Sequence, residues 1–184
     1  SLPPDQLGQV ALWWLLLALA TVLARPLALR LFPDEGGGWI LGKILGWLVV
    51  GWVPWFLASF QLLPFGAASM AGLLLLALAA LRTGLAPRDL RGFAGTEIAF
   101  LVALWLGLAV RLQAPDLTGL EKFTDMGFLT AAMRSDFMPP EDAWFAFHPL
   151  NYYYVGQAMV GSWGNLTGVR SEEHTSELQS LAYL

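Results

Sequence analysis

Long apolar runs, separated by short polar or glycine-rich breaks, dominate the sequence. Four runs are close to the roughly 20 residues that a helix needs to cross about 30 Å of hydrocarbon. They cover residues 7–31, 39–63, 67–82 and 93–112. A weaker fifth run, residues 152–169, includes Gln157, Ser162 and Asn165. The pattern predicts an all-α integral membrane protein with about five transmembrane helices, so that residues 1–169 form the N-terminal part of a multi-spanning membrane domain.

Several residues inside and between the runs predict local structure. Pro26 is expected to kink or end the first helix because its ring removes a backbone donor, although 27–32 could continue the helix into the interface. Residues 33–38, Pro-Asp-Glu-Gly-Gly-Gly, are typical of a turn. Lys43 lies near enough to the start of the second run to extend its ammonium to the interface, and Pro54 is tolerable in a packed membrane helix.

Residues 113–151 form a polar stretch far longer than the other breaks, and we call this stretch the outer segment. Residues 120–137 have helical spacing. One sector of this predicted amphipathic helix would hold the apolar side chains Phe123, Met126, Leu129, Met133 and Phe137, and another would hold Glu121, Asp125 and Ala132. Such a helix would lie along the membrane surface with its carboxylates turned away from lipid.

The distribution of basic residues predicts the orientation. The breaks after the first and third runs hold or flank the basic residues Arg25, Arg30, Lys43, Arg82, Arg88 and Arg91, whereas the second break has no charge. Basic residues concentrate on the cytoplasmic side. The outer segment, which carries the acids Asp116, Glu121, Asp125, Asp136, Glu141 and Asp142, is therefore predicted to be extracytoplasmic.

The composition supports a membrane protein and excludes several kinds of chemistry. Hydrophobic residues make up 57% of the chain and charged residues 13%, with a mean hydropathy of +0.57. A soluble fold would have too little polar surface. The sequence contains no cysteine, which excludes disulfides and thiolate chemistry. We find no phosphate-binding glycine loop, zinc spacing or basic stripe, so membrane lipid is an expected partner and nucleic acid is not.

The last 15 or so residues need separate treatment. The stretch Arg170-Ser171-Glu172-Glu173-His174-Thr175-Ser176-Glu177-Leu178-Gln179-Ser180 resembles one reading frame of a common sequencing-library adapter. We interpret residues 170–184 as an artefact and exclude them from fold reasoning; a polar loop after a membrane helix is the alternative. The chain begins without methionine, and both ends are expected to be truncated.

Candidate chemistry concentrates in and just after the outer segment. Glu121 and Asp125, four residues apart, follow a predicted span that ends near Arg111. This is where the head group of a lipid-linked substrate would lie, although paired carboxylates also occur on ordinary solvated helix faces. His148 is either structural or a ligand. The three tyrosines at 152–154 could be substrate contacts or an aromatic belt at the interface.

Three ordered motifs carry a family resemblance. They are Glu121-Lys122-Phe123-Thr124-Asp125, then Pro139-Pro140-Glu141-Asp142-Ala143-Trp144-Phe145, then His148-Pro149-Leu150-Asn151-Tyr152-Tyr153-Tyr154. Together they resemble the YYY-motif membrane-protein family of Chloroflexi and archaea, over roughly residues 39–169. Thr124 stands where that family usually has Met, and Ala143 where it has Pro. The resemblance implies a prokaryotic cell membrane.

That family is grouped with the type-C glycosyltransferases, which use polyprenyl-phosphate sugars. The resemblance therefore implies sugar transfer at the extracytoplasmic face, with Asp125, or failing that Glu121, as the catalytic acidic residue. Substrate binding would fall to Arg111, Lys122, His148, Asn151, Tyr152, Tyr153 and Tyr154. Mg²⁺ or Mn²⁺ would suit these carboxylates, but two acids do not establish a site. The alternative is a transporter or non-enzymatic membrane component, for which ionisable residues deep in the spans are expected.

Overall fold

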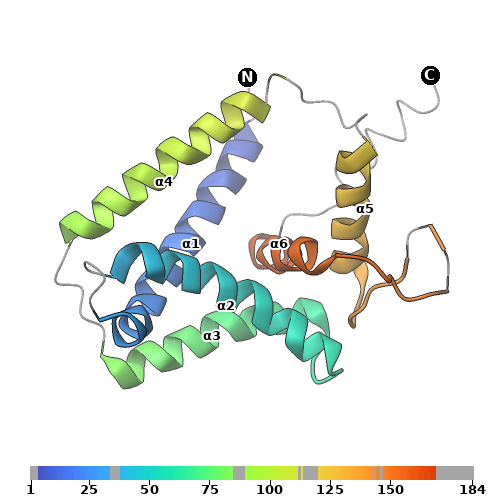
Figure 1. The fold of residues 1–184 in the computed structure, drawn as a ribbon, viewed down its shortest axis with the longest axis horizontal. Helices are drawn as coiled ribbons and strands as arrows, with labels where there is room; N and C mark the ends of the chain where they lie inside the picture. Colours follow the sequence, from blue (N-terminus) through green and yellow to red (C-terminus); the bar gives the residue numbers. More distant parts are fainter. Residues whose placement is uncertain are drawn as a thin grey trace.

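The computed structural model describes residues 4–33, 38–84, 90–111, 113, 120–142, 144, 145 and 147–168 (Figure 1). Within these residues the chain is helical, without strands. The helices are α1 (Pro4–Leu31), α2 (Trp39–Ser59), α3 (Phe65–Thr83), α4 (Leu90–Arg111), α5 (Leu120–Arg134) and α6 (Val155–Thr167). The interpretation of residues 170–184 lies outside the described residues.

Helices α1 to α4 correspond to the first four predicted spans. Their apolar windows are Gly8–Leu31, Trp39–Ser59, Phe65–Thr83 and Arg91–Val110, each long and apolar enough to cross a membrane. The all-helical membrane fold is thus confirmed. Helix α6, in the fifth predicted span, has 13 residues. At about 1.5 Å per residue it is shorter than the hydrocarbon core, so the fifth span remains a prediction.

One of two boundaries differs from expectation. Helix α1 continues past Pro26 to Leu31, as the predicted span 7–31 has it. A packed membrane helix tolerates proline, and the flanking Ala24 and Ala28 are completely buried. Helix α2 ends at Ser59, earlier than the predicted residue 63, because residues 60–63 form a tight turn in which the Leu62 N–H donates to the Leu57 carbonyl at 2.9 Å.

The core of the bundle lies where α6 packs against α2 and α3, with α1 alongside. Trp163 of α6 is 1% exposed, and its ring centroid lies 6.2 Å from that of Trp13 in α1. The Ser162 hydroxyl donates to the Met159 carbonyl at 2.8 Å, so this buried polar group is paired within its own helix. The C-terminal half of α6 is thus anchored inside the bundle.

Glycines allow the first three helices to pack closely. A Cβ on Gly72 of α3 would lie 2.6 Å from the Val50 Cα in α2. A Cβ on Gly46 of α2 would lie 2.8 Å from the Ala20 backbone in α1. Both neighbours are backbone atoms and cannot move aside as a side chain could. Small residues at such contacts are how membrane helices approach one another.

We expect Gly72→Ala to destabilise the bundle by about 1–3 kcal/mol, because the new methyl group would force α2 and α3 apart. Gly66→Ala in the same helix is the matched control, since a Cβ there has no neighbour within 4 Å. Thermal unfolding in detergent measures both. A Gly72→Ala midpoint equal to that of Gly66→Ala would disprove the close α2–α3 contact.

Helix α4 is the least embedded span. Only 6% of its apolar window is buried, against 28–39% for the other three. It contacts α2 mainly through its N-terminal half, and in Figure 1 it diverges from α2 and α3 toward its C-terminal end. The contacts that hold it are side-chain contacts, and they include a charged pair.

Candidate functional site

The outer segment is attached to the turn between α2 and α3. The Phe65 N–H donates to the Asp136 carbonyl at 2.7 Å, and the Met138 N–H donates to the Ala58 carbonyl at 3.3 Å. Three of the bonded residues belong to a buried apolar cluster. The cluster comprises Ala58, Phe65, Phe128, Ala132, Met138, Leu150, Tyr154 and Ala158. Helix α5 thus stands at the α2–α3 end of the bundle, crosswise to both helices in Figure 1.

The buried face of α5 differs from the predicted apolar sector. Phe128 and Ala132 are buried, whereas Phe123 is 56% exposed. Ala132 was expected on the carboxylate face, and Phe137 lies beyond the helix, which ends at Arg134. The amphipathic sector therefore stays a prediction, because spacing alone does not tell which face neighbouring elements cover. Here α6 and the segment leading into it cover the side that includes Phe128 and Ala132.

Asp125 is exposed but not isolated. Its Oδ1 accepts a hydrogen bond of 2.7 Å from the Gln157 side-chain amide. Gln157 belongs to the first turn of α6, so this bond joins the outer segment to the helix that enters the bundle. Asp125 therefore lies at the edge of the α5–α6 contact. Sequence reasoning noted Gln157 only as a polar residue in an apolar run, which was the available signal.

Two other carboxylates are occupied in shaping the loop before α6. Asp142 Oδ1 accepts the backbone N–H groups of Trp144 and Phe145, at 2.8 and 3.2 Å. Glu141 Oε1 accepts the Phe147 N–H at 2.6 Å. A β-bridge between Glu141 and Pro149 closes the loop. These acids satisfy backbone donors, so Asp125 is a better candidate for chemistry than either.

A chain of aromatic rings joins α5 to the segment that leads into α6. Its successive centroids are separated by 6.3, 5.4, 5.4 and 5.5 Å, and it comprises Phe123, Trp144, Phe128, Tyr152 and Tyr153. Of these rings only Phe128 is buried. Tyr152 and Tyr153 are 63% and 88% exposed, so both phenols are available to a ligand or to the membrane interface.

The remaining candidates in this region have distinct environments. Tyr154 is 9% exposed, and its hydroxyl accepts a hydrogen bond of 3.3 Å from the Trp55 indole. It is therefore directed away from Tyr152 and Tyr153, into the core. Asn151 and His148 are exposed. The His148 imidazole stacks on the Phe145 ring, with centroids 4.4 Å apart.

The backbone places three further candidates. Glu121 and Lys122 lie in the first turn of α5, and Arg111 is the last residue of α4; for these three, only the helical backbone is described. Asp125 is one turn along α5 from Glu121. No group of three or more His, Cys, Asp or Glu residues suited to a metal ion occurs in the described part of the chain.

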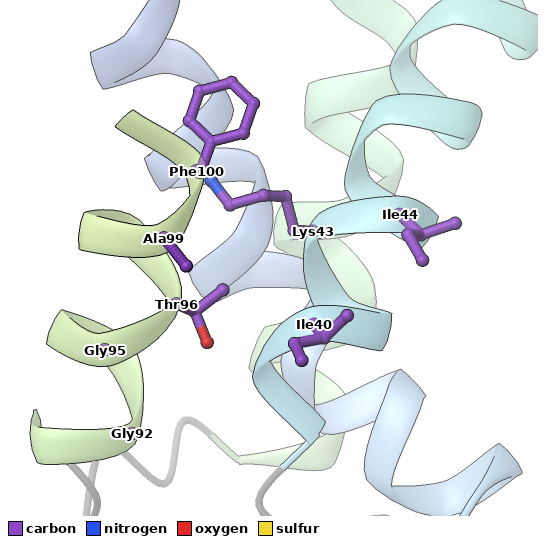
Figure 2. Close-up of a pocket in the computed structure, with 8 residues that line it drawn as sticks. All are labelled: Ile40, Lys43, Ile44, Gly92, Gly95, Thr96, Ala99 and Phe100. Carbon is purple, nitrogen blue, oxygen red and sulfur yellow. The ribbon is translucent and has the colours of Figure 1, made fainter. Parts of the chain in front are cut away.

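A second polar cluster, absent from the predicted site, lies between the spans. Lys43 Nζ of α2 is 2.9 Å from Glu97 Oε1 and hydrogen-bonds to Oε2 at 3.0 Å. The Trp14 indole of α1 donates to the same Oε2 at 2.9 Å. Side-chain exposures are 12% for Lys43 and 6% for Glu97. From the sequence, the Lys43 ammonium was expected to reach the interface. The side chain instead turns toward α4 (Figure 2).

The fold defines a multi-helix membrane protein with a structured polar segment at one end of the bundle. Comparison with protein families agrees. Residues 49–173 match the family described as uncharacterized membrane protein (DUF2298). The match covers more than half of the chain, from the middle of α2 past the end of α6, and the chain belongs to this family. No curated protein and no solved structure matches it.

Proposed function

We propose that the chain is part of a membrane-embedded glycosyltransferase that transfers a sugar from a polyprenyl-phosphate donor at the extracytoplasmic face. One observation carries the proposal: the exposed Asp125 carboxylate is held by Gln157, and the chain between α5 and α6 carries the exposed rings of Trp144, Tyr152 and Tyr153. The motif resemblance to the YYY-motif family, which is grouped with the type-C glycosyltransferases, supports the same reaction.

In this proposal Asp125 is the general base. It accepts the proton of an acceptor hydroxyl while that oxygen bonds to the anomeric carbon, and the bond from that carbon to the polyprenyl phosphate breaks. Because Gln157 donates to Oδ1, we assign the proton to Oδ2. The same carboxylate could instead hold Mg²⁺ or Mn²⁺ beside the donor phosphate, and Glu121 is the second candidate for either role.

Other residues would bind the substrates. Arg111, the last residue of α4, or Lys122, in the first turn of α5, would offset the charge of the donor phosphate. The exposed His148, Asn151, Tyr152 and Tyr153 would contact the sugars. Tyr154, being in the core, would fix the position of the two exposed tyrosines through its bond with Trp55.

The test is a transfer assay on the intact protein in proteoliposomes, with radiolabelled mannose, glucose or arabinose carried on decaprenyl phosphate. We expect the label of at least one donor to leave the lipid fraction in a protein-dependent manner. Label that stays on all three donors, at the level of protein-free liposomes, contradicts the proposal.

A transporter component is the alternative, and the buried Lys43–Glu97 pair favours it, because ionisable residues within spans often mark transport pathways. The pair lies near the beginning of both helices, however, and its charges compensate each other. Protein-dependent passage of a solute across the liposome membrane, without transfer from any donor, would favour this alternative.

A further inference from the structure

A groove lies between the first turns of α2 and α4 (Figure 2). Its volume is about 480 Å³, within the range of about 300–1,000 Å³ typical of small-molecule pockets. Ile40 and Ile44 line the α2 side, Gly95, Ala99 and Phe100 line the α4 side, and Lys43 extends between the helices. Small residues on α4 give the groove its depth.

The groove is positioned to face lipid. Both walls belong to apolar windows long enough to span a membrane, Trp39–Ser59 and Arg91–Val110. Ile40 is 66% exposed and Ile44 50% exposed, so the α2 wall presents apolar surface outward. Around membrane-spanning windows such as these, a bilayer offers hydrocarbon chains and little water.

Charge favours a neutral chain inside the groove and an anionic group at its end. The Lys43 ammonium is paired with Glu97 and lies 4.3 Å from the centre of the Phe100 ring, so it brings no net charge. Arg91, adjacent to Gly92 at the groove's end, is exposed. That end is predicted to be cytoplasmic, where anionic lipid head groups concentrate.

We propose that this groove binds one acyl chain of an anionic glycerophospholipid, with the lipid phosphate at Arg91. The site lies at the end of the spans opposite the outer segment and is independent of the proposed sugar transfer. Bound lipid would fill the space beside a helix that has few protein contacts of its own.

The test uses phosphatidylglycerol with a photoactivatable acyl chain in proteoliposomes, with labelled peptides mapped by mass spectrometry. Gly95→Leu fills the groove, and Gly107→Leu is the matched control on the same helix, because a Cβ at either position has no neighbour within 4 Å. We expect Gly95→Leu to reduce labelling of residues 40–44 and 92–100 several-fold, and Gly107→Leu to leave it unchanged.

Arg91→Gln tests the head group. It should reduce labelling by phosphatidylglycerol several-fold and leave labelling by the same probe built on phosphatidylcholine unchanged. Equal labelling of the two leucine variants would overturn the acyl-chain site. Equal loss with both lipids would overturn the phosphate contact. Groove peptides that are unlabelled in every variant would mean that another helix, not lipid, fills the groove.

Discussion

Replacing Asp125 by Asn should lower sugar transfer by about 10²- to 10⁴-fold, or roughly 3–5.5 kcal/mol of activation free energy. The amide keeps the shape of the carboxylate but cannot accept the acceptor proton. A carboxylate that is merely exposed would contribute almost nothing to the rate. The effect should appear in the rate of transfer at saturating donor, measured in proteoliposomes.

Asp136→Asn is the matched control, because Asp136 is exposed in the same segment and contacts the bundle through its backbone carbonyl. It should retain full activity. If the two variants transfer sugar equally fast at equal expression, Asp125 has no part in the mechanism and Glu121 becomes the first candidate.

Breaking the Lys43–Glu97 pair should produce the largest loss of stability. We expect Lys43→Met or Glu97→Met to cost about 3–5 kcal/mol, since each leaves a buried partner without its counter-charge. The double variant should recover much of that loss, because it removes both charges and leaves apolar side chains of similar length. Unfolding by denaturing detergent, followed by tryptophan fluorescence, measures all three variants.

The control is again Asp136→Asn. Because this charge is exposed, its removal should change the free energy of unfolding by no more than about 0.5 kcal/mol. The non-additivity of the double variant is the informative quantity. If the two single losses simply add, the charges do not stabilise each other, and α4 is held by its apolar contacts alone.

The four long spans could be predicted from sequence because the membrane requirement is strict. A run of about 20 apolar residues such as 93–112 has few other stable conformations, and α4 appears at Leu90–Arg111. The end of α2 was less predictable. Leu62 and Leu63 are apolar but belong to the turn, since the chain must reverse before α3.

The side-chain contacts could not be predicted because they depend on helix rotation. Glu97 is an acid near the start of a predicted span, but its pairing with Lys43, 54 residues away, requires that α2 and α4 face each other. The same applies to α5, where the packing of α6 determines that Phe128 and Ala132, rather than Phe123, are buried.

In the candidate site, some features could be predicted from the sequence and others could not. The motifs identified Asp125 and the tyrosines as residues of interest, and the structure places Asp125 near α6 and exposes Tyr152 and Tyr153. Tyr154, chemically identical to its neighbours, lies in the core. The chain turns into α6 at this residue, so consecutive tyrosines face different surroundings.

Every role proposed for the outer segment requires it to lie outside the cell, opposite the basic breaks. Because the protein has no cysteine, single cysteines at positions 136 and 89 can report sidedness directly. A membrane-impermeant maleimide should label Asp136→Cys in intact cells and should label Asp89→Cys only after the membrane is permeabilised. Labelling of position 89, and not of position 136, in intact cells would contradict the topology and with it the extracytoplasmic site.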